Sequence, residues 1–522
     1  MSASAHLPDS REQKTSGYVL FCAFTAILGG FNAGYNAGVP NISQDTIINC
    51  IPNPNSTSFF PDCLPMSPWT WGFSVGVFAI GGLIGSTLAG SLTAQFGRKR
   101  TLFWNNLLFI IGGLILAMST SIPVFTTGRV LVGIASGVVG VAIPAYLAEI
   151  STEKLRGSLG ISLELSQMLG IFVSQGLCIP FIGIPGWRWL MGGTIAPALL
   201  QMCLLPFCKE TPRFLILKGD LSKARTSLER LRRGYHIELE FQEMIDSQKV
   251  PTASRASLCS RNSWVSPVIP KSPISLKSPT SPRSSVSFKI PTSPKSPVSP
   301  KASIRMSKIG PTLEAGITII ETMKPLNIFQ ILRDHKLRRP ALVGITLFAF
   351  QPLSGIIGIV YYSTAIFERV FGPRKAEFVT VGIAAMNMMM TFISAVVIER
   401  AGRKTLLLIS EVGMIISSII LVFSSLNSVD SAVVAGAIMF VASFAIGLGP
   451  ITVVMIPEMM PTSAISAVVS MANNVGWICT FSIGLLTPVL NETLNSYTFC
   501  IFVVINTIAI IFTACFVPNI RH

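Results

Sequence analysis

The side chains with the clearest chemical potential lie inside long apolar segments. Glu164 and Gln167 occur three positions apart in the apolar stretch 158–180, so they share one face of a predicted helix. A carboxylate two turns inside a membrane span costs on the order of a few kcal/mol unless it is paired, protonated or facing water. Gln167 is weaker evidence, since glutamine often joins membrane helices by hydrogen bonds. We interpret the pair as marking what the charged turns described below guard.

A second polar pair lies in the glycine-rich stretch Gly29–Gly38. Asn32 and Asn36 are four positions apart and share a helix face. They either hydrogen-bond to neighbouring helices or line a polar pathway, and the sequence leaves both alternatives open.

A third group of side chains is ionic and lies between two apolar segments. The stretch Pro144–Gly157 contains Glu149, Glu153, Lys154 and Arg156 within eight residues. Similar charged turns occur at residues 95–100, 209–215 and 399–405. We interpret these turns as partners in a charge clamp at the cytoplasmic surface.

The elements that position these residues are predicted to be membrane helices. Of the 522 residues, 50% are hydrophobic and 12% are charged, and the mean hydropathy is +0.61. A soluble chain would contain about 25% charged residues. Apolar segments of roughly 20 residues recur along the chain, and each is long enough to cross a lipid bilayer. We therefore predict an all-α membrane protein with twelve transmembrane helices.

The net charge of +16 does not indicate nucleic-acid binding, because of where the charge lies. Ten Lys and Arg residues fall between residues 251 and 311, a segment without Asp or Glu. Most of the remaining excess lies in short loops, as the positive-inside rule requires. We expect no nucleic-acid partner.

The predicted helices divide six and six around a central insert. We predict a cytoplasmic tail (1–16), a six-helix bundle (17–208), a cytoplasmic helical segment (209–248), a disordered Ser/Pro/Lys-rich loop (249–311), a further cytoplasmic segment (312–340), a second six-helix bundle (341–517) and a cytoplasmic tail (518–522). QFGRKR and ERAGRK align through Gly97 and Gly402, each after the second helix of a half. Parallel repeats of this kind are typical of the major facilitator architecture.

Three residues lead to more local expectations. Pro352 predicts a break in the seventh helix. The first helix is expected to run from about Gly17 to about Val39, and Arg129 lies near the outer end of its predicted helix, where its side chain can snorkel.

An enzyme is not indicated. The sequence contains four His, no nucleophile–base arrangement, no phosphate-binding glycine loop and no metal-ligand spacing among its ten Cys. We expect no cofactor and no metal ion.

Motifs from both halves together resemble the sugar porters, particularly the facilitative glucose and hexose transporters. They are GGFNAGYNAGV, QFGRKR, GRVLVG, PAYLAEISTEKLRG, KETPRFL, QPLSG, YYSTAIF, ERAGRKTL and GLGP, in that order along the chain. The resemblance covers nearly all of the chain except residues 249–311. It implies the major facilitator fold and alternating access, in which two six-helix bundles rock around a sugar site near the membrane midplane.

The resemblance also implies a cytoplasmic gate formed by the charged turns. The corresponding residues are Arg98, Glu149, Arg156, Glu210 and Arg213 in the first half and Glu399, Arg400, Arg403 and Glu458 in the second. Ion pairs at such a boundary contribute about 1 kcal/mol each, which suits a gate that must open.

Sugar porters bind their substrate mostly through amides, which both donate and accept hydrogen bonds as hydroxyls do. The residues that we expect to bind substrate are Glu164, Gln167, Gln351, Asn387, Trp477 and Asn36. Glu164 occupies a position where the family usually has glutamine. Other family side chains are replaced by Pro352, Ile357, Val453 and Gly476. A site with fewer hydrogen-bonding groups should bind a hexose weakly or prefer another polyol or a less polar solute.

The coupling mode stays open at this point. Proton-coupled sugar porters have an aspartate where this chain has Asn36, and an amide cannot titrate, so the sequence favours facilitative uniport. The alternatives are a proton-coupled sugar or polyol symporter that uses Glu164, and a non-transporting sugar sensor that signals through the central loop.

Modification motifs lie outside the predicted spans. Asn55 and Asn491 begin N-x-S/T sequons in loops expected to face outward. The central loop contains Ser-Pro dipeptides that suit a proline-directed kinase, at Ser266, Ser272, Ser278, Ser281, Ser293, Ser296 and Ser299. We expect a multi-pass protein of the plasma membrane with both termini in the cytoplasm.

Overall fold

The structure, a computed structural model, describes residues 16–49, 60–181, 186–233, 235–246, 328–398, 401–427 and 429–518. The described residues up to Ile245 and from Ile328 onward belong to one compact unit. The remaining segment Asp246–Thr322 forms a second unit, of which only Asp246 is described. Several predicted sites lie outside the described residues: Asn55, Glu399, Arg400, Ser266, Ser272, Ser278, Ser281, Ser293, Ser296 and Ser299. Nothing is described of the side chain of Arg156.

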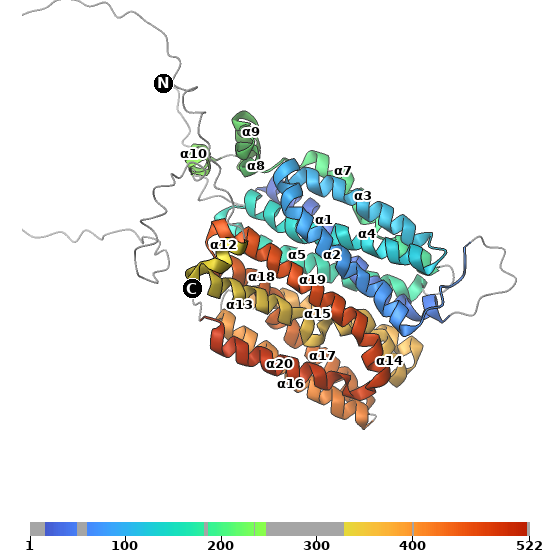
Figure 1. Ribbon diagram of the computed structural model, residues 1–522. Helices are drawn as coiled ribbons and strands as arrows, with labels where there is room; N and C mark the ends of the chain where they lie inside the picture. Colours follow the sequence, from blue (N-terminus) through green and yellow to red (C-terminus); the bar gives the residue numbers. More distant parts are fainter. Residues whose placement is uncertain are drawn as a thin grey trace, which may run out of the picture. The chain divides into compact units, whose positions relative to one another are not determined.

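The described residues contain twelve helical stretches that are long and apolar enough to cross a membrane, as predicted. The first six are formed by α1 (Gly17–Ile48), α2 (Pro68–Phe96), α3 (Arg98–Ala117), α4 (Ile122–Ile150), α5 (Glu153–Phe181) and α6 (Gly186–Gly192) with α7 (Ile195–Leu204). The last six are formed by α13 (His335–Gln351) with α14 (Ile357–Phe371), α15 (Pro373–Val397), α16 (Arg403–Leu426), α17 (Asp430–Ile446) with α18 (Leu448–Met459), α19 (Thr462–Thr493) and α20 (Thr498–Phe516). Figure 1 shows α1–α7 beside α13–α20 as two bundles.

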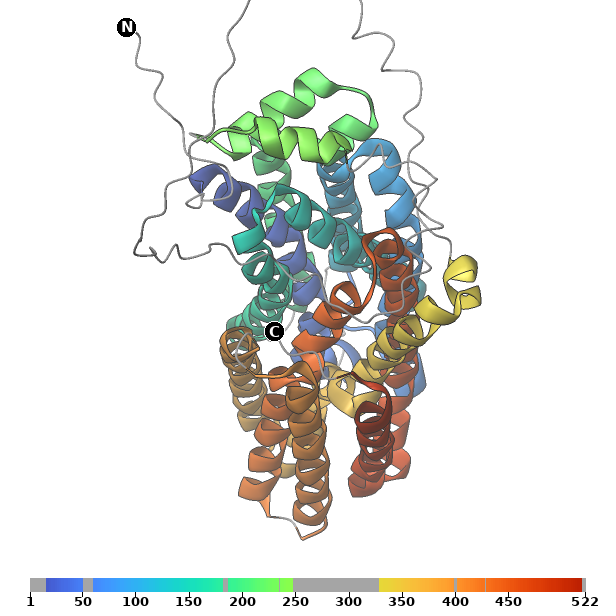
Figure 2. The ribbon, with the colours of Figure 1, turned by 90° about the vertical axis from the view of Figure 1, so that its left-hand side faces the viewer.

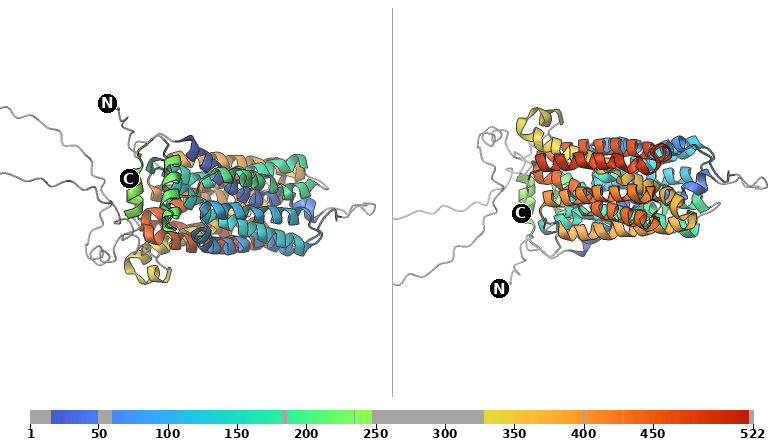
Figure 3. Two further views of the ribbon diagram at one scale, coloured as in Figure 1. Left: turned by 90° about the horizontal axis from the view of Figure 1, so that it is seen from above. Right: turned by 90° about the horizontal axis from the view of Figure 1, so that it is seen from below.

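Four short helices from the segment between the two bundles gather at one end of them. They are α8 (Pro212–Leu217), α9 (Leu221–Leu231), α10 (Glu238–Asp246) and α12 (Ile328–Arg333). Figure 2 and Figure 3 show the green α8–α10 and the yellow α12 at the same end of the long helices. We call this end of the bundles, where α4 and α18 finish, the charged end.

Glycines let the helices of the first bundle approach until their backbones touch. A Cβ added at Gly34 of α1 would lie 2.0 Å from the carbonyl oxygen of Gln167 on α5. A Cβ at Gly85 of α2 would lie 2.0 Å from the carbonyl oxygen of Ile134 on α4. Membrane helices associate by such close packing of small residues, which also fixes how each helix is rotated about its axis.

The first helix is longer than predicted, because Pro40 does not end it. Proline lacks the N–H that would bond to the carbonyl of residue 36, so that carbonyl is left without its helical partner. Arg129 of α4 supplies the missing donor, with Nη1 2.7 Å from the Asn36 carbonyl oxygen. α1 therefore continues to Ile48. Arg129 does not snorkel, since its side chain is fully buried and also lies over the Phe78 ring.

The predicted break in the seventh span is present. Pro352 begins a π-helical turn, η3 (Pro352–Ile356), in which Gly355 has φ +106°, outside the helical region. The side chain of Asn506 on α20 donates to the freed carbonyl of Ser354 at 3.2 Å. The tenth span is also interrupted, at Gly447 between α17 and α18.

Candidate functional site

A small cavity lies where α5 of the first bundle meets α14, α15 and α17 of the second. Its volume is about 20 Å³, enough for roughly one water molecule. The side chains that surround it are Ile171, Gln175, Ile359, Val360, Ser363, Thr380, Ile383, Ala384, Asn387 and Val441. The bundles are thus closed around a mainly apolar cavity with four polar residues in its wall, and the cavity is too small for a sugar in this conformation.

Two amide side chains line this cavity, one from each bundle. Gln175 of α5 is 2% exposed and Asn387 of α15 is 5% exposed. Their side-chain oxygens, Oε1 and Oδ1, are buried and have no hydrogen-bond partner among the described residues. An unsatisfied buried acceptor costs about 1–3 kcal/mol. A ligand that brings hydroxyl donors into an enlarged cavity would remove that cost at both residues.

Gln175 was not among the predicted substrate-binding residues, although the sequence contained a signal for it. It lies eleven positions after Glu164, which is close to three helical turns, so both side chains project from one face of α5. The Glu164 carboxylate is half-buried, and the structure gives it no hydrogen bond or ion pair with a described residue. The polar face of α5 thus extends from Glu164 to Gln175.

Gln167 is not among the residues that line the cavity. Its backbone carbonyl packs against Gly34, which turns this part of the helix towards α1. Its side chain is half-buried. Gln167 is therefore less directly connected to the cavity than Gln175.

Gln351 joins the two interrupted spans of the second bundle. Its Nε2 donates to the Gly449 carbonyl oxygen at 3.2 Å, linking the end of α13 to the start of α18. The side chain is half-buried. An amide at this break can change partner when either helix moves.

The structure places Asn36 inside the first bundle instead of at the cavity. The residue is fully buried, and its Nδ2 donates to Thr194 Oγ1 at 2.8 Å. Asn32 accepts from the same hydroxyl at 2.6 Å. Of the two alternatives for this pair, the geometry matches hydrogen bonding between neighbouring helices.

Trp477 lies between the bundles but away from the cavity. Its ring packs edge-on against Phe78 at 5.9 Å between centroids, and a Cβ on Gly82 would meet it at 2.6 Å. The tryptophan therefore closes the contact between α19 and α2. Ser86 extends this contact by donating to Asn474 at 2.8 Å.

At the charged end, two predicted gate residues of each bundle form an ion pair. Arg98 Nη2 lies 2.8 Å from Glu149 Oε1, and Arg403 Nη2 lies 3.0 Å from Glu458 Oε1. The first pair joins α3 to α4, and the second joins α16 to α18. Each pair therefore joins two helices of the same bundle, the first pair in the first bundle and the second pair in the second bundle.

The other described gate residues have different environments. Glu210 Oε1 accepts hydrogen bonds from the backbone N–H groups of Arg98 and Lys99 at 3.0 and 3.1 Å, so it caps the start of α3. Arg213 is exposed, and the structure gives it no ion-pair partner among the described residues. Glu210 and Arg213 thus do not form an ion pair with each other.

Arg232, which the sequence did not single out, joins the short helices α9 and α10 to the first bundle. It donates to the carbonyl oxygens of Ile150 and Ser151 at 2.8 and 3.0 Å and pairs with Glu240 at 2.9 Å. Cations at a helix C-terminus stabilise its free carbonyls. The end of α4, next to Glu149, is therefore linked to α9 and α10.

The expected outer sites are only partly within the structure. Asn491 lies in the last turn of α19, at the end opposite the charged end. Cys63 is disulfide-bonded, and its partner is outside the described residues, as is Cys50.

Comparison with known proteins places this architecture in context. The family described as sugar (and other) transporter matches residues 21–269 and 293–522. The solute carrier family 2 facilitated glucose transporter member 3 of Bos taurus is 31% identical over 523 residues, covering 97% of this chain and 91% of the relative. Member 4 of Homo sapiens is 28% identical over 529 residues, covering 98% and 90%.

A solved structure of similar fold is that of the xylose transporter XylE from E. coli in a partially occluded inward-open conformation. It superimposes with a TM-score of 0.70 at 20% identity, covering 97% of this chain and 99% of the other. The proton:xylose symporter XylE bound to 6-bromo-6-deoxy-D-glucose gives a TM-score of 0.68 at 20% identity, covering 97% of each chain. The major facilitator fold predicted from the repeats is thus confirmed.

Proposed function

The chain belongs to the sugar transporter family of the major facilitator superfamily, and we propose that it is a facilitative hexose carrier that works by alternating access. The observation that carries this proposal is the pair of buried, unsatisfied amide oxygens of Gln175 and Asn387, on opposite bundles around one cavity. Amides match sugar hydroxyls in both donor and acceptor capacity. The names of the relatives, facilitated glucose transporters, support a hexose as substrate.

The environment of Asn36 and Arg129 supports uniport. Asn36 is neutral, and Arg129 Nη1 and Nη2 donate to the backbone carbonyls of Asn36 and Val75 at 2.7 and 3.4 Å, while its Nε is buried without a partner among the described residues. The structure gives Arg129 no carboxylate partner among the described residues. A transport cycle at this pair would therefore not need to protonate an acid.

Proton-coupled sugar transport is the second candidate, because of Glu164. Its carboxylate shares a helix face with Gln175 and forms no hydrogen bond or ion pair with a described residue. A carboxylate without a fixed partner is free to bind and release a proton. The fold similarity to a proton:xylose symporter makes this alternative worth a direct test.

The two modes are separated by sugar uptake into proteoliposomes with and without an inward proton gradient. Facilitative transport predicts equal initial rates in both conditions and continued uptake by Glu164→Gln. Uptake that requires the gradient and is abolished in Glu164→Gln would establish symport. Sugar binding without any flux would favour the sensor.

We further propose the orientation and location of the protein. The charged end, with α8–α10, would face the cytoplasm, because basic residues of short loops stay on that side. The relatives support the plasma membrane. A protease that cleaves the chain after residue 246 in sealed right-side-out vesicles would contradict this orientation.

A further inference from the structure

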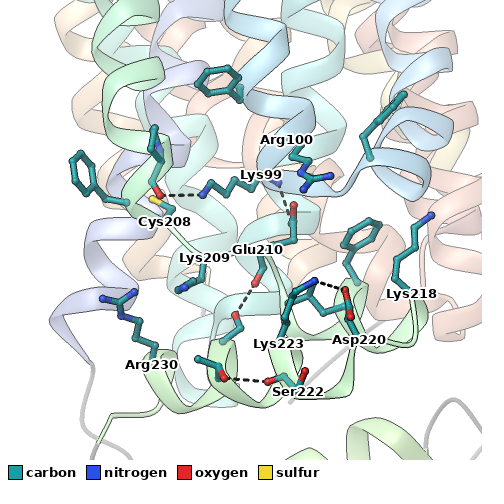
Figure 4. Close-up of a pocket in the computed structure, with 18 of the residues that line it drawn as sticks. Lys99, Arg100, Cys208, Lys209, Glu210, Lys218, Asp220, Ser222, Lys223 and Arg230 are labelled. Atoms are coloured by element: carbon teal, nitrogen blue, oxygen red, sulfur yellow. Dashed lines mark hydrogen bonds and ion pairs between the residues drawn. The ribbon is translucent and has the colours of Figure 1, made fainter.

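A basic pocket separate from the cavity between the bundles lies at the charged end of the first bundle. It is bounded by the end of α2, the start of α3, the turn η2 (Leu205–Phe207) and the helices α8 and α9 (Figure 4). Its volume is about 1180 Å³. Six cationic side chains line it against two carboxylates, and the cations are Lys99, Arg100, Lys209, Lys218, Lys223 and Arg230.

Each carboxylate in this pocket has partners through one oxygen, and the other oxygen of Glu210 is buried without a partner among the described residues. Glu210 Oε1 accepts from the backbone N–H groups of Arg98, Lys99 and Thr211 at 3.0 to 3.2 Å. Asp220 pairs with Lys223 at 2.9 Å. Arg100, Lys209, Lys218 and Arg230 therefore have no carboxylate partner among the residues that the structure describes.

These four cations come from several elements that converge on one space. Two of them contact aromatic rings: Lys218 lies over Phe214 at 5.8 Å and Arg230 over Tyr18 at 5.7 Å. Arg100 projects from the first turn of α3 and Arg230 from the last turn of α9, and they lie on different walls of the pocket (Figure 4). Guanidinium groups bind phosphate oxygens through paired, charge-assisted hydrogen bonds. The pocket is large enough for more than one phosphate, with cations on opposite sides.

The rim of the pocket has the composition of a membrane–water interface. Phe96 at the end of α2 is 46% exposed, and Phe207 at the end of η2 is 68% exposed. Phe103 lines the pocket and packs edge-on against Trp104, which is 60% exposed. Exposed aromatic side chains next to basic ones at the ends of spans mark the depth of lipid headgroups.

We propose that this pocket binds the headgroup of an anionic membrane lipid with more than one phosphate, that is, a phosphoinositide. Its phosphates bridge Arg100 of α3 and Arg230 of α9, while its acyl chains run along Phe96 and Phe207. Because α3 also carries Arg98 of the ion pair with Glu149, a bound lipid holds α9 against the helices of the gate. The binding itself is independent of which solute the protein transports.

The test is a titration of the purified full-length protein with a short-chain phosphatidylinositol bisphosphate. The pocket variant is Arg100→Gln/Arg230→Gln. The control is Arg338→Gln/Arg339→Gln, which removes the same charge from exposed positions on α13. We expect the pocket variant to bind at least about tenfold more weakly, because each cation near an anionic lipid contributes roughly a fivefold factor. The control should bind like the wild type.

Two further arms make the test specific. Arg100→Lys/Arg230→Lys keeps the charge but loses the paired hydrogen bonds, so its affinity should lie between those of the wild type and the glutamine variant. A melting temperature of the glutamine variant equal to that of the wild type shows that a loss of binding is not due to misfolding. Short-chain phosphatidylcholine should not bind. Equal weakening in the pocket and control variants would overturn the proposal, and so would inositol trisphosphate binding as tightly as the lipid, since the latter indicates a soluble phosphate ligand.

Discussion

Asn41 of α1 and Ser363 of α14 join the two bundles at the end opposite the charged end. Asn41 Nδ2 lies 2.8 Å from Ser363 Oγ, and Asn41 Oδ1 accepts from the backbone N–H of Thr364 at 3.1 Å. Ser363 also lines the cavity with Gln175 and Asn387. The contact that closes this end thus adjoins the candidate sugar site.

Asn41→Ala should loosen this end of the molecule. The change removes three hydrogen bonds between α1 and α14, including one to the Val360 carbonyl. We expect faster amide hydrogen exchange in peptides that cover residues 357–367. Asn49→Ala is the matched control, because Asn49 bonds only within its own helix turn, to Asp45. Equal exchange in both variants would argue against a role for Asn41 in closure.

Gln175→Ala and Asn387→Ala should each weaken sugar binding. Each removes an amide that gains hydroxyl donors when the sugar binds, so the KM for sugar exchange should rise by about five- to tenfold. Exposed Asn427 bonds only to Phe423 in its own helix, and Asn427→Ala should leave KM unchanged. An unaltered KM in both cavity variants would move the substrate site elsewhere.

Breaking the Arg98–Glu149 pair should favour opening at the charged end. Both side chains are partly buried, and a pair at such a boundary contributes about 1 kcal/mol. We expect Glu149→Ala and Arg98→Ala to increase labelling of a cysteine placed at Met459, and the double variant to add little. Strictly additive effects would show that the two side chains act independently.

Arg129 and Pro40 should be energetically coupled. Arg129→Met leaves the buried Asn36 carbonyl without a donor, which should cost about 1–3 kcal/mol. Pro40→Ala restores a backbone N–H for the same carbonyl. The melting temperature should therefore fall less for Arg129→Met in the Pro40→Ala background than in the wild type. Equal losses would contradict the proposed exchange of donors.

Glu210 should make stability depend on pH. Burial raises the pKa of its carboxyl, although the backbone N–H groups that it caps lower it. Between the unfolded pKa of about 4.3 and the raised pKa of the native state, Glu210 is protonated in the native state but ionised in the unfolded state. The free energy of unfolding therefore falls as the pH rises through this window. Glu210→Gln does not titrate. The melting temperature of the wild type should decline relative to this variant as pH rises above about 4.3, and a parallel pH profile would contradict the raised pKa.

Local sequence features predicted the parts of the fold that depend on local chemistry. Twelve apolar segments predicted twelve spans, and Pro352 predicted the break in the seventh. The end of the first helix was predicted too early, because α1 continues past Pro40 with Arg129 as the donor to the Asn36 carbonyl. Arg129 lies on α4, so the spacing of residues along α1 gives no indication of this donor.

The candidate site was harder to predict because it depends on helix rotation. Asn36 and Asn387 are both amides within spans, yet one bonds inside its bundle and the other lines the cavity. Backbone contacts at glycines such as Gly34 determine which face of a helix points inward. Gln175 could have been found, since its spacing from Glu164 continues the polar face of α5.

The central claim is that a sugar crosses between the two bundles by alternating access without a proton gradient. Its most direct test is trans-acceleration in proteoliposomes at equal pH on both sides. Unlabelled D-glucose inside should increase the initial uptake of labelled D-glucose by the wild type, and the double variant Gln175→Ala/Asn387→Ala should lose this increase at the same sugar concentration. Uptake by the wild type that internal sugar leaves unchanged, or that appears only with an inward proton gradient, would contradict the account.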